Sequence, residues 1–177
     1  MTLEELLKLE QSRRNVDQVV GIIQHNPELF NNLWNIFISN REPESRRAAW
    51  AIDILNEDLS FINNNHLETL VDLLPDFRHS GLQRHALRIL ERNDLPKKNQ
   101  GELVSICFRL LESNEAPVAV KMFSLKILAR VAMQEPDLIR ELVEIIEIQI
   151  EDSTPGFKSI GGKIIKQLQR SRKPINF

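Results

Sequence analysis

Acidic residues and a histidine come close together between residues 68 and 79, where their spacing could support chemistry. Asp72, Asp76 and His79 would share one side of a helix, and three such groups can hold a metal ion. Pro75 disturbs that helix, however, and no second histidine joins the group. Glu68, four residues before Asp72, is typical of a surface carboxylate and not of an acid/base pair. We therefore expect no metal ion and no catalytic carboxylate in this segment.

The other reactive residue types stand at positions that favour packing. Cys107 is the single cysteine and takes an aliphatic position, so it indicates a core residue, not a nucleophile, and it cannot form an internal disulfide. His85 lies on an apolar face and is typical of a packed core histidine. Gly161 and Gly162 follow no predicted strand and so do not indicate a phosphate loop. The sequence thus predicts no catalytic residue, no cofactor and no enzyme.

Basic residues, in contrast, recur at fixed positions. Arg84, Arg88 and Arg92 are four residues apart, which places them on one side of a helix. Lys126 and Lys163 repeat the position of Arg88 later in the chain. We interpret this ladder as a binding surface for an anionic partner, with an ordinary solvated face as the alternative. The candidate partner-binding residues are Arg84, Arg88, Arg92, Lys126, Arg130, Lys163 and Arg170.

Two families of helical segments repeat along the chain and would position these residues. One family has a ring, a small residue, an aliphatic residue, a charge, then Ile and Leu, and begins at Trp50, His85 and Phe123, with a looser copy at Ile160. A second family of apolar helices falls between these copies with the same period of about 36 residues. No hairpin signal separates alternating runs, so the fold class is all-α. The small position, which would allow close helix contact, is held by Ala51, Ala86, Ser124 and Gly161.

A repeated helix pair predicts an α-solenoid, because one pair cannot bury its apolar face alone. We expect one domain over residues 1–172, built from about five stacked antiparallel pairs. Residues 1–25 form a degenerate pair that caps the stack, and residues 173–177 form a short tail. The regular pairs are expected at about 26–57, 63–93, 99–133 and 136–170.

Two segments carry a resemblance to a known family. Residues 42–55 (EPESRRAAWAIDIL) resemble the turn and second helix of a HEAT repeat, and residues 115–128 (EAPVAVKMFSLKIL) resemble them too. The resemblance covers residues 26–169 and departs from the family pattern in lacking a regular ladder of Asp and Arg. It implies a right-handed superhelical array, a scaffold role and no catalytic residue. It also implies that the second helices line a concave face.

Charge is distributed unevenly along this expected stack. Residues 1–152 hold 17 basic and 25 acidic residues, whereas residues 153–177 hold 6 basic and no acidic residues. The first helices of the regular pairs hold 11 acidic and 2 basic residues, and the second helices hold 12 basic and 4 acidic residues. These counts predict an acidic outer wall and a groove that becomes more basic toward the C-terminus.

The sequence also bears on location. No apolar run approaches the roughly 20 residues of a membrane helix, and the first residues lack the basic start of a secretory signal. We therefore expect a cytoplasmic protein that makes no contact with a membrane.

The leading functional hypothesis is a non-catalytic scaffold or adaptor that binds an acidic segment of another protein in the basic groove. The alternative is a nucleic-acid-associated protein, because DNA glycosylases with HEAT-like folds grip DNA with aromatic residues and a carboxylate, the residue types of Trp50 and Asp53. Against it stand the 6% aromatic content, the net charge of −2 and the repeat position of Trp50, which indicates the core. Apolar surface at either end of the stack makes a weak homodimer a further option.

Overall fold

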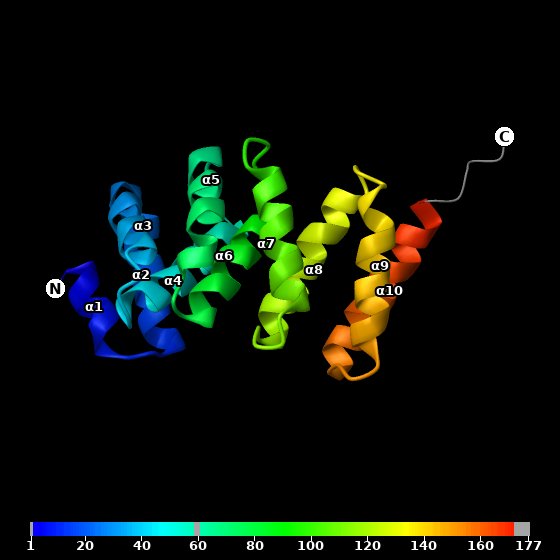
Figure 1. The fold of residues 1–177 in the computed structure, drawn as a ribbon. Coiled ribbons are helices and arrows are strands. Elements are labelled where there is room, and N and C mark those ends of the chain that lie inside the picture. Colours follow the sequence, from blue (N-terminus) through cyan, green and yellow to red (C-terminus); the bar gives the residue numbers. More distant parts are fainter. Residues whose placement is uncertain (1, 59–60, 172–177) are drawn as a thin grey trace. The chain divides into compact units, whose positions relative to one another are not determined.

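Helices make up the regular structure of the chain. The computed structural model describes residues 2–58 and 61–171, and these contain ten α-helices and no strand (Figure 1). The all-α prediction is therefore confirmed. The helices are α1 (Leu3–Leu9), α2 (Arg13–His25), α3 (Phe30–Ile38), α4 (Glu44–Asp58), α5 (Asn64–Leu73), α6 (Ser80–Arg92), α7 (Gln100–Glu112), α8 (Val118–Ala132), α9 (Leu138–Ile150) and α10 (Pro155–Ser171).

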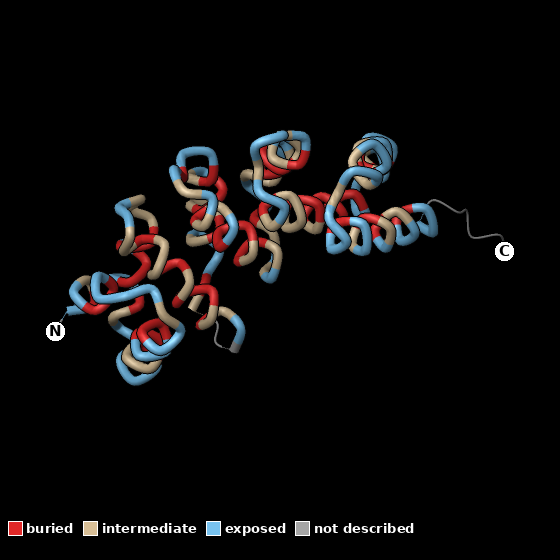
Figure 2. The backbone as a smooth tube through the Cα atoms, turned by 90° about the horizontal axis from the view of Figure 1, so that it is seen from below, coloured by how far each residue is buried: buried red, intermediate tan, exposed pale blue. Residues whose placement is uncertain are grey.

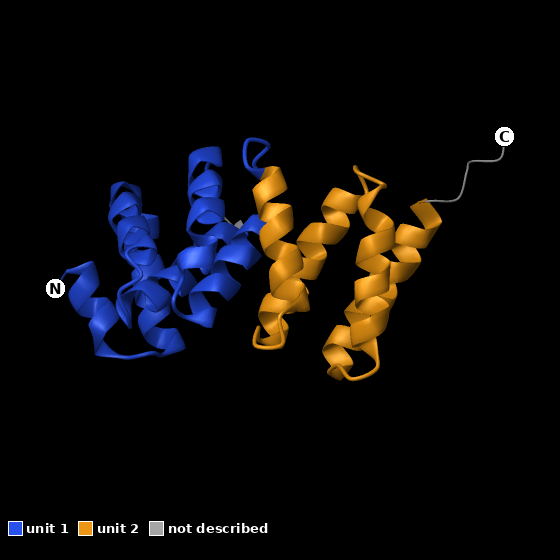
Figure 3. Ribbon diagram, viewed as in Figure 1, with its two compact units in different colours: residues 1–99 blue, residues 100–177 orange. Residues whose placement is uncertain are grey.

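These helices form two compact units (Figure 3). Unit 1 covers residues 1–99 and contains α1–α6, and unit 2 covers residues 100–177 and contains α7–α10. In both units consecutive helices pack in pairs, and the second helices of neighbouring pairs contact each other, as α2, α4 and α6 do in order and as α8 and α10 do. The single domain expected over residues 1–172 stays a prediction.

Local side-chain bonds explain where several helices begin and end. Thr2 begins α1 with a reciprocal capping box, since its hydroxyl accepts from the Glu5 amide and its own amide donates to the Glu5 carboxylate. Asn63 caps α5 in the same way with His66. The α5 helix ends at Leu73 and continues only as the short 3-10 helix η2 (Leu74–Asp76), because Pro75 has no amide proton to donate. These bonds satisfy amide groups that a helix end leaves without partners.

The turn before α4 is tied to the turn before α6 within unit 1. Asn40 has a positive φ of 58°, a conformation that asparagine adopts more readily than most residues. Its side-chain amide donates to the Asp76 carbonyl at 2.9 Å, and its side-chain oxygen accepts from the Arg78 amide at 3.2 Å. Two neighbouring helix pairs are thereby held in register at this edge of unit 1.

Close helix packing occurs at the small position of the repeat. Ala51, Ala86 and Ser124 are fully buried, and Gly161 is buried as well. A β-carbon added to Gly161 would lie 2.9 Å from the Cγ2 atom of Ile146, so α10 approaches α9 too closely for a larger residue. The predicted close approach at the small position is confirmed at Gly161, and the other three small residues are buried.

The apolar core of each unit lies on the helix sides that face one another (Figure 2). One expectation about this core is wrong. Trp50 is only half-buried, although its repeat position indicated the core, and Phe123 and Ile160 are half-buried at the same position of their copies. Among the helices of residues 2–58 and 61–171, none is both long and apolar enough to cross a membrane.

Candidate functional site

The basic ladder begins in unit 1, where a buried carboxylate holds two of its members. Asp53 lies on α4, is 1% exposed and faces α6. The Arg88 guanidinium donates from Nη1 to its Oδ2 atom at 3.0 Å, and Arg92 donates from Nη1 to its Oδ1 atom at 3.1 Å. A buried carboxylate is stable only when cations and donors surround it, and these two arginines provide both.

A second carboxylate extends this contact by one helical turn. Glu57 follows Asp53 by four residues, and its Oε1 atom accepts from Arg88 at 3.3 Å and from Arg92 at 3.0 Å. Two acidic residues spaced by one turn on α4 therefore meet two arginines spaced by one turn on α6. Much of the charge that these arginines carry is neutralised inside unit 1.

His85 completes the network. Its Nδ1 atom lies 3.0 Å from Oδ2 of Asp53, and its Nε2 atom lies 3.2 Å from Nη2 of Arg84. Because arginine only donates hydrogen bonds, Nε2 accepts, and Nδ1 carries the proton that is donated to Asp53. His85 is buried, as predicted for a core histidine, but its link to Asp53 was not predicted. The sequence signal was present, since Asp53 holds the repeat position that Arg88 holds in the next copy, which brings opposite charges to neighbouring helices.

The later members of the ladder lie in unit 2, on α8 and α10. Lys126 and Arg130 are on α8, and Lys163 and Arg170 are on α10, which contacts α8. Neither α8 nor α10 contains an acidic residue. Lys126 also stacks its ammonium group over the ring of Phe123, 5.3 Å from the centroid, which holds the charge near the surface of α8.

An open groove of about 570 Å³ lies at the C-terminal ends of these two helices. Three of its cations, Lys163, Lys166 and Arg170, form no ion pair with any residue in the described ranges. An apolar side chain, Met133, is 43% exposed there. Neither Met133 nor Lys166 was among the partner-binding residues predicted from the sequence. The groove is lined by Met133, Lys163, Lys166, Gln167, Arg170 and Ser171.

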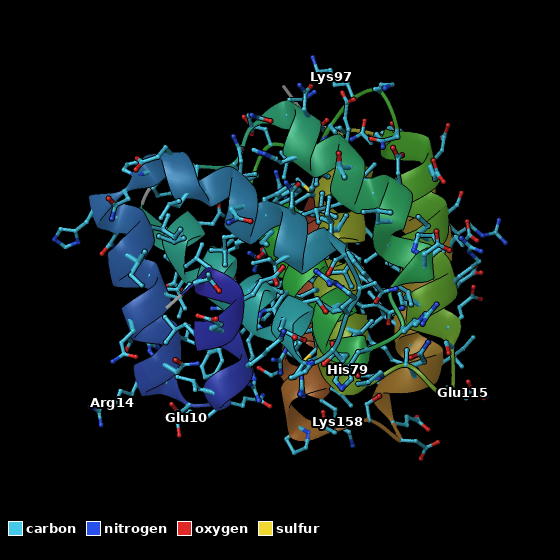
Figure 4. All side chains as sticks on the ribbon, turned by 90° about the vertical axis from the view of Figure 1, so that its left-hand side faces the viewer. Glu10, Arg14, His79, Lys97, Glu115 and Lys158 are labelled. Carbon is cyan, nitrogen blue, oxygen red and sulfur yellow. The ribbon has the colours of Figure 1, made fainter. Side chains whose placement is uncertain are left out.

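We call the residues of this surface the basic face of unit 2. On α8 and on α10 the residues of this face follow one another at intervals of three or four, about one helical turn, so each helix presents them from one side. Lys158, in contrast, is an exposed cation of α10 that does not line the groove and extends from the first turns of the helix (Figure 4). The basic face comprises Lys126, Arg130, Met133, Lys163, Lys166 and Arg170.

The residues considered for catalysis or metal binding do not assemble into such a site. Asp72 and Asp76 are exposed, and the Nδ1 atom of His79 accepts from the Gly81 amide. Burial raises the pKa of the Cys107 thiol to about 12, so this thiol is no ready nucleophile. Within residues 2–58 and 61–171, no three His, Cys, Asp or Glu side chains are placed to share a metal ion.

Comparison with known protein families identifies one family that this chain matches. A model of the HEAT repeat domain matches residues 3–168, which is nearly all of the chain. Neither a search of curated proteins nor a search of solved structures finds a match.

Proposed function

Because the chain belongs to the HEAT repeat family, whose members generally serve as protein-interaction scaffolds, we propose that it is a non-catalytic scaffold that binds an acidic segment of another protein on the basic face of unit 2. The observation that carries this proposal is the groove in which Lys163, Lys166 and Arg170 surround the exposed Met133 without an ion pair in the described chain.

Electrostatics favours an anionic occupant. Lys163, Lys166 and Arg170 line one groove, and neither α10 nor α8, which contacts it, holds a carboxylate, so these three cations repel one another. A partner that brings carboxylates to this surface relieves that repulsion and is attracted to it over a distance of about 10 Å at ordinary salt.

The apolar part of the groove favours a protein over a nucleic acid. Met133 is flexible and polarisable and can pack against an aliphatic or aromatic side chain of the partner. A protein segment can combine such a side chain with carboxylates, whereas a phosphate backbone cannot. The net charge of −2 for the whole chain also disfavours nucleic acid, because the remaining surface repels phosphates.

The test uses a labelled, Glu-rich helical peptide that carries two Leu residues, and fluorescence anisotropy of the full-length chain. We expect the variant Lys163→Glu/Lys166→Glu/Arg170→Glu to lose at least about thirtyfold in affinity, because each reversal removes an attraction and adds a repulsion. Lys158→Glu is the matched control, since it reverses a cation of the same helix outside the groove. Its affinity should stay within about twofold of the parent.

Two further measurements separate the alternatives. Met133→Ser should weaken the Leu-containing peptide but leave a Leu-free acidic peptide unchanged. A single-stranded DNA of matched charge tests the nucleic-acid alternative, whose affinity would fall steeply between about 50 and about 200 mM salt. DNA that binds more tightly than the peptide, or a triple variant that binds the peptide as well as the parent does, would reject the proposal.

A further inference from the structure

The most exposed large apolar side chain of the described residues lies on α9, away from the basic face of unit 2. Ile148 is 78% exposed, more than Leu9 at 63% or Met133 at 43%. An aliphatic side chain this exposed leaves apolar area in contact with water, which covering it would remove. Single exposed apolar residues are common on protein surfaces, so the surroundings decide whether this one has a role.

Ile148 lines a cleft of about 250 Å³ between the end of α7, the turn after it, and α9. The floor of the cleft is held in place by Gln149. Its Oε1 atom accepts from Nζ of Lys121 at 3.2 Å, and its Nε2 atom donates to the Leu111 carbonyl at 2.8 Å. One amide thus joins α7, α8 and α9, so the cleft is preformed. Its lining residues are Glu112, Asn114, Lys121, Ile145, Ile148 and Gln149.

The rim of this cleft is negatively charged. Glu112 lines the cleft, and four further carboxylates lie within three residues of lining residues in the chain. All five are exposed and form no ion pair within the part of the chain that the structure describes. The helices α7 and α9 both end here, at Glu112 and Ile150, and a helix C-terminus carries a partial negative charge. Lys121 is the single basic residue of the lining, and it is bonded to Gln149. The five carboxylates are those of Glu112, Glu115, Glu147, Glu151 and Asp152.

We propose that this cleft, the α9 cleft, is a second docking site and that it binds a basic segment of a protein partner. One aliphatic or aromatic side chain of the partner enters the cleft against Ile145 and Ile148, and flanking Lys or Arg residues pair with the carboxylates of the rim. Charge complementarity selects this occupant, because an acidic or neutral segment would leave the rim carboxylates unpaired. Unit 2 would then hold partners of opposite charge on different helices, which goes beyond the function proposed above.

The experiment measures binding of a labelled helical peptide with Lys residues on both sides of a single Leu, using the full-length chain. We expect Ile148→Ser to lower the affinity at least about tenfold, because the apolar contact of the Leu is lost. Ile148 is too exposed for this change to affect folding, which circular dichroism can verify. Leu9→Ser removes another exposed aliphatic side chain, from unit 1, and should leave the affinity unchanged.

A second pair of changes separates charge from apolar contact. Glu112→Gln/Glu147→Gln should lower the affinity several-fold at low salt and change it little at high salt. A peptide with Ser in place of Leu should bind the parent no better than the original peptide binds Ile148→Ser. Binding that is insensitive to Ile148→Ser would overturn the proposal. It would equally be overturned if light scattering showed the parent to be a dimer that Ile148→Ser dissociates, because the cleft would then belong to a second copy of the chain.

Discussion

Units 1 and 2 place basic residues at the same position of the repeat and use them differently. In unit 1 this position of α6 is held by Arg88, and the second helix before it, α4, offers Asp53 and Glu57. In unit 2 the same position of α10 is held by Lys163, and the second helix before it, α8, offers Lys126 in place of a carboxylate. The role of a cation in this stack is thus decided by the charge of the preceding second helix. A repeat position alone does not identify a binding residue.

The largest expected effect is the loss of Asp53. Asp53→Ala leaves buried His85 and the Nη1 atoms of Arg88 and Arg92 without their acceptor, so we expect a loss of about 3 to 5 kcal/mol in the free energy of unfolding. Both tryptophans of the chain, Trp34 and Trp50, are in unit 1. Urea unfolding followed by tryptophan fluorescence therefore reports the effect directly.

Arg170→Ala, which removes a cation of the basic face of unit 2, is the control and should leave the fluorescence transition unchanged. A loss below about 1 kcal/mol in Asp53→Ala would mean that the network around this carboxylate contributes no more than a surface ion pair does.

Charge reversal at the shared position sharpens the contrast. Arg88→Glu would add a carboxylate beside Asp53 and Glu57. We expect the free energy of unfolding of unit 1, measured by tryptophan fluorescence, to fall by about 2 kcal/mol. Lys163→Glu would place a carboxylate among cations. The free energy of unfolding of unit 2 should therefore rise, by less than about 0.5 kcal/mol. The rate of Cys107 alkylation in urea follows unit 2, because this is the single cysteine. Equal losses in both variants would remove the distinction between the two units.

Alkaline pH should act on unit 2 through Cys107. Burial raises the pKa of this thiol to about 12, compared with 9.0 for an unperturbed thiol. Above pH 9 the unfolded chain releases a proton that the folded unit keeps, so the stability falls as the pH rises. We expect the free energy of unfolding to fall by about 1 kcal/mol as the pH rises from about 9 to about 10, measured by urea unfolding and circular dichroism. Cys107→Ala should remove this part of the pH dependence whatever it does to stability at neutral pH.

Acidic pH should lower the stability of unit 1, and this is the smallest of the four stability effects predicted for the two units. Burial against the rings of Phe30 and Trp34 lowers the pKa of His66 below 6.5. The Nδ1 atom of His66 also accepts from the Asn63 amide, which requires an unprotonated nitrogen. As the pH falls below 6.5 the unfolded chain takes up a proton that the folded unit resists, so the stability falls. His66→Gln keeps a capping-box residue and should give a flatter fluorescence-detected stability profile between pH 6.5 and the acid limit. An unchanged slope would assign the acid sensitivity to another group.

The fold could be predicted from the sequence because its determinants recur in register. The small residues Ala51, Ala86 and Gly161 appear once in each copy, and each is buried where two helices meet. The disturbance of α5 by Pro75 was predicted too, since proline acts through its own backbone and needs no knowledge of neighbours.

The candidate site could be predicted only in part, because its properties depend on contacts between repeats. Asp53 was not linked to the ladder from the sequence, although consecutive copies of a repeat are neighbours in space, so opposite charges at one position in two copies meet. Ile148 was also overlooked, although it lies outside the side of α9 that carries the buried residues Ile139, Leu142 and Ile146. Met133 and Lys166 form a groove only through the contact of α8 with α10, which no local pattern contains.

The opposite charges of α9 and α10 have a kinetic consequence. The α9 helix carries three glutamates and one arginine, and its partner in the pair carries four cations and no carboxylate. Such a hairpin has a permanent electric dipole directed across the pair, and this dipole exerts a torque on any polar macromolecule that diffuses toward it. An approaching protein would be turned into a productive orientation before first contact, so the rate of encounter, more than the lifetime of the complex, would respond to the ionic strength of the medium.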